Sequence, residues 1–207
     1  VVLGFIIARA IDKPSFFVIF VLASGLLYIY STYLKSITIV GNIVVAGLVS
    51  LCILLVGIFD LAPAMTRANQ ASQLFFLDLI KDYAIFAFML NLLREIIKDI
   101  EDIDGDYKMG IRSLPIVLGR ERTTKLAFIL SFIPLAVIIV YLSNNLYKQP
   151  LAMGYVLLLI IAPLIYATIK LFNAETKRDY KMISNILKLV MLTGILSLLL
   201  FQFILIK

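Results

Sequence analysis

The sequence contains no histidine, no tryptophan and a single cysteine, and only 15% of its 207 residues are charged. Soluble domains carry about 25% charged residues on average, so this composition argues against a soluble globular protein. The cysteine, Cys52, has no partner for an intramolecular disulfide, and its apolar surroundings predict a small buried hydrophobic side chain. Hydrophobic residues make up 62% of the chain. The composition is therefore typical of a membrane protein.

Apolar segments predict how the chain is organised. A short apolar stretch, residues 1–10, is interpreted as the end of a helix whose start precedes Val1, because a span needs about 20 residues. Longer segments predict six further membrane helices, at residues 16–33, 39–59, 72–99, 123–142, 151–171 and 184–206. The predicted fold class is all-α, a multi-span transmembrane helical bundle that forms a single domain over residues 1–207.

Lysine and arginine are unevenly distributed between the two sides that these spans define. If the spans alternate in direction, one side holds 13 of the 19 basic residues: Lys35, Arg94, Lys98, Lys108, Arg112, Arg120, Arg122, Lys125, Lys170, Lys177, Arg178, Lys181 and Lys188. The positive-inside rule predicts that this side is cytoplasmic. The net charge of +6 follows the loops between spans, which favours membrane lipids or anionic substrates as partners and no nucleic acid.

The most informative part of the chain is the acidic stretch of residues 94–106, at the end of the third long span. At 100° per residue, Glu95, Asp99, Asp102 and Asp106 fall within about 60° on one helical face. A charge at membrane depth costs about 2.5–3.5 kcal/mol, so such a cluster indicates function. Carboxylates are ligands of Mg²⁺, which bridges them to substrate phosphates. These four acids are therefore the predicted metal ligands, and the three aspartates are also the predicted catalytic residues.

Three basic residues bracket these acids. Lys98, Lys108 and Arg112 are predicted to bind the remaining phosphate oxygens or the departing pyrophosphate. Each has an alternative interpretation as an ordinary solvated charge of a cytoplasmic loop. Glu95 also has an alternative interpretation, as a partner of Arg94 or Lys98 in an ion pair that lowers the cost of burying its carboxylate.

The stretch from Arg94 to Gly119 closely resembles the second aspartate-rich motif of the UbiA superfamily of intramembrane prenyltransferases. Its pattern is Arg94-Glu95-x-x-Lys98-Asp99-x-x-Asp102-x-x-Gly105-Asp106-x-x-x-Gly110-x-x-Ser113-Leu114-Pro115-x-x-x-Gly119. Ser113 stands where threonine is more frequent, and Gly105 and Gly110 are expected to let the backbone turn beside the site. Tyr30 and Lys35 resemble the family's Tyr/Lys motif, which implies that both bind the diphosphate.

This resemblance implies a fold of nine helices in the complete protein, of which about six and a half would be present here. It also implies an enzyme in which two acidic motifs hold Mg²⁺ on a polyprenyl diphosphate, the donor of a prenyl group to a lipophilic acceptor. The family's first aspartate-rich motif is absent from the sequence. We expect it in N-terminal helices that precede Val1, so that residues 1–207 supply the C-terminal two-thirds of the domain and half of the metal site.

The acceptor is less well defined by the sequence. The acidic motif is most similar to the ether-lipid branch of the family, which implies transfer of a geranylgeranyl group to geranylgeranylglyceryl phosphate. An aromatic prenyltransferase of quinone biosynthesis, with 4-hydroxybenzoate or 1,4-dihydroxy-2-naphthoate as acceptor, is the alternative. A membrane transporter without enzymatic activity is the alternative from another class, but it predicts acids scattered along mid-membrane helices and not one compact cluster.

Overall fold

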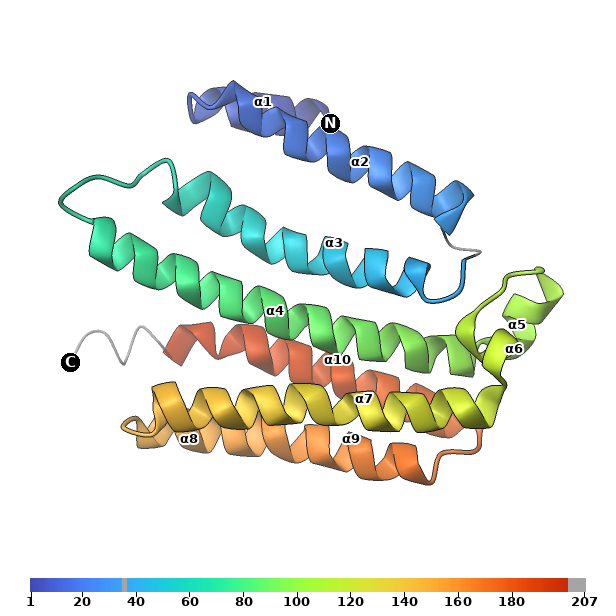
Figure 1. Ribbon diagram of the computed structural model, residues 1–207. Helices are drawn as coiled ribbons and strands as arrows, with labels where there is room; N and C mark the ends of the chain where they lie inside the picture. The colour runs from blue at the N-terminus through green and yellow to red at the C-terminus, as the bar shows by residue number, and fades with distance from the viewer. Residues whose placement is uncertain (35–36, 201–207) are drawn as a thin grey trace. The chain divides into compact units, whose positions relative to one another are not determined.

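The computed structural model describes residues 1–34 and 37–200, and the regular elements in this part of the chain are helices. The chain divides into two compact units, Val1–Phe88 and Met89–Lys207. One long helix, α4 (Gln70–Glu101), begins in the first unit and ends in the second (Figure 1). This architecture confirms the predicted all-α fold class.

The first unit is built from α1 (Val2–Ala10), a 3₁₀ turn (Pro14–Phe16), α2 (Phe17–Thr32), α3 (Val40–Val56), a π-helical turn (Gly57–Leu61) and the first part of α4. Aromatic rings join the 3₁₀ turn and α2 to the π-helical turn after α3: the Phe59 ring lies 5.3 Å from that of Phe16 and 5.2 Å from that of Phe20. The Ser50 hydroxyl donates a hydrogen bond of 2.8 Å to the Ala84 carbonyl and so links α3 to α4.

The second unit is a helical bundle. It consists of the last part of α4, α7 (Arg120–Tyr141), α9 (Ala162–Phe172) and α10 (Lys177–Leu196), with α5 (Ile103–Lys108) and α6 (Leu114–Leu118) between α4 and α7. Two π-helical turns, Leu142–Leu146 and Leu157–Ile161, and α8 (Pro150–Val156) complete it. The second π-helical turn joins α8 to α9, so the predicted span over residues 151–171 is one rod with a local change of pitch.

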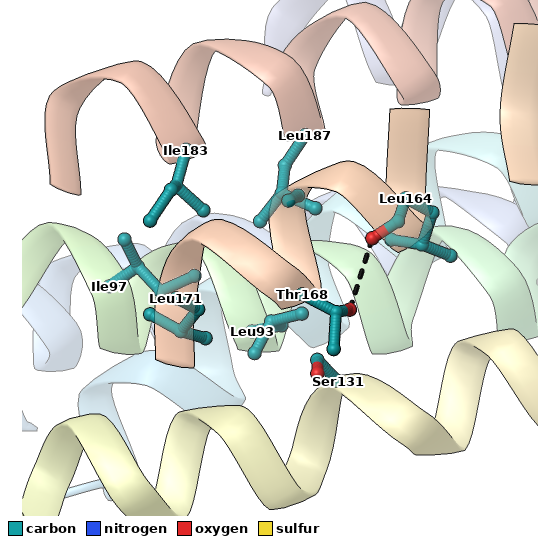
Figure 2. A pocket seen from close by; sticks show the side chains of 9 residues that line it. Leu93, Ile97, Ser131, Leu164, Thr168, Leu171, Ile183 and Leu187 are labelled. Carbon is teal, nitrogen blue, oxygen red and sulfur yellow. Dashed lines mark hydrogen bonds between the residues drawn. The ribbon is translucent and has the colours of Figure 1, made fainter. Parts of the chain in front are cut away.

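The core of this bundle lies where its four long helices meet (Figure 2). Side chains from all four interdigitate there and leave no space for a water molecule: Leu93, Ile97, Ser131, Leu164, Ala167, Thr168, Leu171, Ile183 and Leu187. The polar group of Thr168 is satisfied locally, because its hydroxyl donates a hydrogen bond of 3.0 Å to the Leu164 carbonyl. The centre of the second unit is thus a filled apolar core, and function has to be sought at its ends or on its surface.

Much of the outer surface is apolar as well. On α7, Ile129, Ile133 and Val140 are each half exposed or more. A monomer in water rarely exposes so much apolar surface, whereas lipid accepts it. Among the described residues, five helical segments are long and apolar enough to cross a membrane: Pro14–Thr32, Val40–Leu61, Arg120–Leu146, Pro150–Phe172 and Lys177–Leu200. The protein is therefore an integral, multi-pass membrane protein.

The sixth predicted span does not satisfy the same criteria. The helix α4 is long enough, but its uncharged stretch covers only residues 83–93, between charged side chains on either side. The prediction that residues 72–99 cross the membrane therefore stays a prediction.

Two sequence-based expectations are corrected by the structure. The last helix begins at Lys177, not at residue 184, because Thr176 and Asp179 form a capping box that satisfies its first N–H groups. Residues 201–207 of that predicted span lie outside the described part of the chain. Cys52 is exposed on α3 and not buried. In a membrane, an apolar side chain has no need to face the protein interior, since lipid tails are equally apolar.

Candidate active site

Charged side chains collect at one end of the second unit, where α4 ends and α7 and α10 begin. We call this the charged end; α5 and α6 form its outer connection (Figure 1). Its acidic residues include Glu95, Asp99, Glu101, Asp102, Asp104 and Asp106, and its basic residues include Arg94, Lys98, Lys108, Arg112, Lys170, Lys177 and Arg178. All predicted site residues from Glu95 to Arg112 thus lie in one region of the fold.

The helix that carries the predicted acidic face is interrupted within that face. The helix α4 ends at Glu101, and Asp102, with φ −98° and ψ 9°, is the junction from which α5 begins. Helical spacing persists across the junction, since the Asp102 N–H donates to the Lys98 carbonyl and the Asp106 N–H donates to the Asp102 carbonyl, at 2.9 and 3.0 Å. Asp106 therefore lies on a separate short helix, one turn beyond Asp102, and not on α4 itself.

Two of the predicted metal ligands already have cationic partners. The Glu95 carboxylate lies 2.6 Å from Nη1 of Arg94, and these side chains are only 16% and 17% exposed. This is the pairing that the alternative interpretation of Glu95 expected. An oxygen of Asp102 lies 3.9 Å from Nζ of Lys177, at the start of α10, and here both side chains are well exposed. Glu95 thus belongs to a largely buried pair, whereas Asp102 is accessible to a ligand.

The acids do not form a complete metal cage. Within residues 1–34 and 37–200, no three Asp, Glu or Cys side chains converge closely enough to hold a metal ion. Mg²⁺ does not require such a cage, because it usually keeps several waters and takes one or two carboxylates together with substrate phosphates. Asp102, whose side chain is 46% exposed, and Asp106, one helical turn further along, supply oxygen donors of that kind. The donor set therefore fits Mg²⁺ held jointly with a phosphate ligand.

The predicted phosphate-binding residues have different positions. Lys98 is exposed on the last turns of α4, Lys108 is exposed at the end of α5, and Arg112 is exposed between α5 and α6. Tyr30 lies on α2, in the first unit. Lys35 lies outside the described residues. The structure thus gathers three of the five predicted anion-binding residues at the charged end.

Glycine shapes the connection between α5 and α7 at two points. Gly110 has φ +69° and ends α5, where its N–H donates to the Tyr107 carbonyl and the Ile111 N–H donates to the Asp106 carbonyl. These two bonds form a Schellman motif, which favours glycine. Gly119, with φ +88°, begins α7. Gly105, in contrast, is an ordinary residue inside α5, so its expected role in a sharp turn is wrong.

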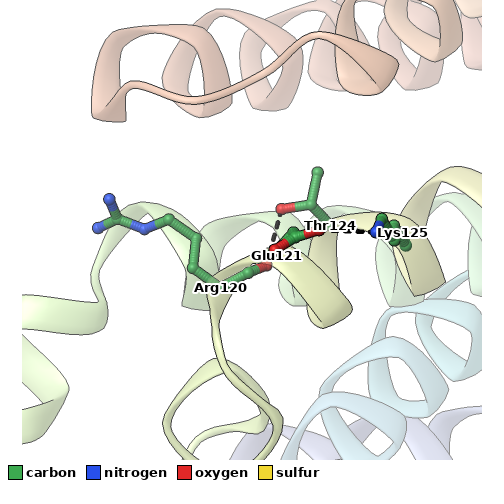
Figure 3. Close-up of polar contacts among 4 residues, drawn as sticks. All are labelled: Arg120, Glu121, Thr124 and Lys125. Atoms are coloured by element: carbon green, nitrogen blue, oxygen red, sulfur yellow. Dashed lines mark hydrogen bonds and ion pairs between the residues drawn. The ribbon is translucent and has the colours of Figure 1, made fainter.

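The connection is anchored to the bundle by buried residues. Ser113, Leu114 and Pro115 at the start of α6 are all buried, although the Ser113 hydroxyl has no hydrogen-bond partner in the described part of the chain. At the start of α7, the Thr124 hydroxyl lies 2.9 Å from the Arg120 carbonyl, and Lys125 pairs with Glu121 at 2.6 Å (Figure 3). The buried residues thus hold the C-terminal side of the segment that carries Lys108 and Arg112, and the two contacts within α7 stabilise the first turns of the helix that follows.

Sequence reasoning did not identify the contribution of the turn between α9 and α10. The Tyr180 hydroxyl lies 2.9 Å from the Thr124 hydroxyl and donates a bond of 2.9 Å to the Ala174 carbonyl, so α7, the turn and α10 are tied together. Lys177, which lies 3.9 Å from Asp102, belongs to the first turn of the helix that this tie positions. The signal was present in the sequence, because Thr176-x-x-Asp179 is a capping-box pattern, but the apolar run begins several residues later.

Comparisons with known proteins identify the family of the chain. The sequence model of the UbiA prenyltransferase family matches residues 1–203. A digeranylgeranylglyceryl phosphate synthase from Methanosphaera stadtmanae is 32% identical over 200 residues, which cover 95% of this chain and 65% of the relative. A protein of the same name from Pyrococcus furiosus is 34% identical over 186 residues, covering 87% of this chain and 58% of the relative.

A third relative of that name, from Thermococcus sibiricus, is 32% identical over 197 residues, which cover 94% of this chain and 63% of the relative. The chain thus spans somewhat less than two thirds of the length of these relatives. No solved structure matches the chain. The family match includes nearly every residue, together with the whole charged end, and we conclude that the chain belongs to the UbiA prenyltransferase family.

Proposed function

We propose that this protein catalyses the Mg²⁺-dependent transfer of a polyprenyl group from a polyprenyl diphosphate to a lipophilic acceptor. The observation that carries the proposal is the charged end, where accessible carboxylates and several cations lie together on a bundle that exposes many large apolar side chains elsewhere. A diphosphate joined to a long hydrocarbon chain has the same division of polarity. The match to the prenyltransferase family supports the same conclusion.

In this proposal the three aspartates Asp99, Asp102 and Asp106 hold the metal, which would offset the charge of the diphosphate. Glu95 has the weakest support among the four predicted ligands, because Arg94 already binds its carboxylate at 2.6 Å. A second role for Glu95 is consistent with its burial: the pair stiffens the last turns of α4, on which Asp99 lies.

The basic residues stabilise the leaving group. Lys98, Lys108 and Arg112 lie around the acids and donate charge-assisted hydrogen bonds to phosphate oxygens as the bond to C1 of the prenyl chain breaks. Lys35 and Tyr30 are proposed to contribute in the same way. In this proposal, apolar helix faces around the bound prenyl chain limit the access of water, which would otherwise capture the allylic cation in place of the acceptor.

For the acceptor we propose geranylgeranylglyceryl phosphate, with geranylgeranyl diphosphate as donor. The support is that several relatives at about 32% identity are named digeranylgeranylglyceryl phosphate synthases, a name that contains this product. The site is proposed to open to the cytoplasm, because most basic residues of the second unit lie at the charged end.

The test uses membranes that contain the full-length protein, Mg²⁺ and labelled geranylgeranyl diphosphate. Geranylgeranylglyceryl phosphate and 1,4-dihydroxy-2-naphthoate are offered separately, and the variants are Asp102→Ala and, as a matched control, the exposed neighbour Asp104→Ala. We expect label to appear in the glycerol phosphate product, to depend on Mg²⁺ and to be lost in Asp102→Ala but not in Asp104→Ala.

The other results have definite meanings. Transfer only to the naphthoate would keep the prenyltransferase and its metal site but would make the protein an enzyme of quinone biosynthesis. Flux of a solute across the membrane, without release of pyrophosphate, would instead support a transporter. Absence of transfer to any acceptor offered would contradict the proposed activity.

A further inference from the structure

Lysines follow one face of α10 from the charged end toward the middle of the helix. Lys177, Lys181, Asn185 and Lys188 fall within about 80° around the helix axis, and all four are exposed. We call these four residues the polar face of α10. Another side of the same helix packs into the bundle core through Tyr180, Ile183, Ser184, Leu187 and Val190.

The polar face extends deep along a helix that is long and apolar enough to span a membrane. A helix rises 1.5 Å per residue, so Lys188 lies roughly 16 Å along the axis from Lys177. A flexible lysine stem can bring the ammonium group back toward the membrane surface, but a charge on a membrane-spanning helix is costly wherever it lies at hydrocarbon depth, and such charges usually mark functional sites. Neither Lys181 nor Lys188 forms an ion pair within the part of the chain that the structure describes.

Helix electrostatics also work against these lysines as purely structural residues. Lys177 occupies the first turn of α10, where a cation opposes the helix dipole. Lys177 and Lys181 are four residues apart on the same face, so their charges repel each other. An anion bound to this face would relieve both effects and would also lower the cost of placing Lys188 in the membrane.

The same side of α10 becomes apolar beyond the lysines. Leu189, Leu192 and Leu196 are 50%, 59% and 46% exposed. They lie beyond Lys188 on the exposed side of α10, toward its C-terminal end. Positive charge is therefore followed by hydrocarbon along a single helix. This order matches an amphiphile with a phosphate head and a long apolar chain.

Lys177 connects this face to the candidate active site. Its ammonium group lies 3.9 Å from Asp102, one of the proposed metal ligands. A phosphate bound beside Lys181 would thus lie one helical turn from Lys177 and its carboxylate partner. The residues proposed for the donor diphosphate, Lys98, Lys108 and Arg112, belong to other elements, so a second anion has its own set of cations.

We propose that the polar face of α10 binds the phosphate group of the acceptor lipid, with Lys181 and Lys188 as its main contacts. This inference rests on the proposed function, and it makes a lipid phosphate the preferred class of acceptor. An uncharged or aromatic acceptor would leave these lysines without a counter-charge.

Direct binding tests this without requiring turnover. The protein in zwitterionic detergent is titrated with geranylgeranylglyceryl phosphate and with its dephosphorylated form, geranylgeranylglycerol. The variants are Lys181→Gln, Lys188→Gln and the double variant, and Lys170→Gln is the matched control, an exposed lysine of α9 at the charged end. We expect the double variant to bind the phosphate form about 10- to 100-fold more weakly, with little change for the alcohol or in the control.

Equal affinity of the unchanged protein for the two lipids would overturn the inference, as would an equal loss in Lys170→Gln. Binding of phosphatidylglycerol in competition, with the same affinity as the probe, would assign the face to bulk anionic lipid and would also overturn it. These results differ from failure of the proposed function, which would appear as absence of prenyl transfer by the unchanged protein.

Kinetics provide a second readout that a merely structural role would not change. In neutral-lipid nanodiscs, the Lys181→Gln and Lys188→Gln variants should raise KM for the phosphate acceptor and leave KM for geranylgeranyl diphosphate within about twofold. An increase confined to the donor KM would show that the face binds the diphosphate instead, and the inference would then be wrong.

Discussion

The two ends of the second unit differ in charge although both reverse the direction of the chain. At the end opposite the charged end, α7 passes through a π-helical turn and a short loop into α8, and Lys148 is the charged residue of that connection. Neutral polar residues and Pro150 complete the turn there. A helical bundle of this kind therefore does not need a cluster of charges in order to turn.

The charged end itself provides a second comparison. The turn from α9 to α10 uses residues 173–176, whereas the connection from α4 to α7 uses residues 102–119 and contains two short helices. Long connections in compact proteins are usually functional. The positive-inside rule explains the bases of this end, but acids contribute little to orientation. The carboxylates of residues 95–106 therefore need an explanation other than topology.

The largest effect is expected when one of those carboxylates is removed. Asp102→Asn keeps the size of the side chain but not its charge, and we expect prenyl transfer to fall by about 10²–10³-fold, as for the loss of one group that stabilises developing charge. The measurement is initial rate at saturating Mg²⁺, and Asp104→Asn is the control. Equal loss in both variants would indicate a general effect of acidity at this end and not a specific site.

The next effect concerns the shape of the long connection. In Gly110→Ala, a side chain is forced into a left-handed conformation, which costs about 1–2 kcal/mol. We expect faster hydrogen exchange and proteolysis within residues 102–119. Gly105→Ala is the matched control, because Gly105 lies inside α5 and a Cβ there meets no other atom. That variant should stabilise α5 by about 0.5–1 kcal/mol, and a loss of stability there would contradict the structure.

These two glycines also show how far sequence reasoning extends. The pattern of the motif indicated that both mattered, but only the backbone shows that Gly110 has a positive φ and Gly105 does not. The break at Asp102 was equally hidden, because hydrogen bonds from Asp102 to Lys98 and from Asp106 to Asp102 preserve helical spacing across it. Local pattern identified the residues, and the backbone determined which helix carries each one.

Hydropathy had a different limitation. It located the long membrane segments, because lipid requires about 20 apolar residues of a helix. It misplaced the start of α10, since the first turns carry Lys177, Arg178 and Lys181 and are polar. It also suggested that Cys52 is buried, although lipid accepts an exposed thiol. Hydropathy reports which residues the membrane tolerates. It therefore does not locate the end of a helix that extends beyond the hydrocarbon, and it does not distinguish a side chain that faces lipid from one that is buried in the protein.

An intermediate effect tests the contact between α10 and the acidic motif. Lys177→Ala removes an exposed partner of Asp102, and an exposed ion pair contributes only about 0–1 kcal/mol to stability. We expect little change in thermal stability but about a tenfold fall in kcat/KM for the donor, equivalent to about 1.4 kcal/mol. Arg178→Ala removes the same charge from the adjacent position. If it has the same effect, net charge and not the contact with Asp102 is responsible.

The smallest effect is expected at the end opposite the charged end. Lys148→Gln removes the charge of the connection between α7 and α8, and its ammonium group interacts there only with the ring of Tyr147, at 5.3 Å, in the described part of the chain. We expect rate, KM and thermal stability to stay within experimental error, because no proposed ligand group lies at this end. Loss of one basic residue among many should not reverse the orientation of the protein in the membrane. Protease accessibility of residues 102–119 in sealed vesicles would verify this. A large loss of activity with unchanged orientation would contradict the comparison itself, since it would place part of the chemistry at an end built from neutral side chains.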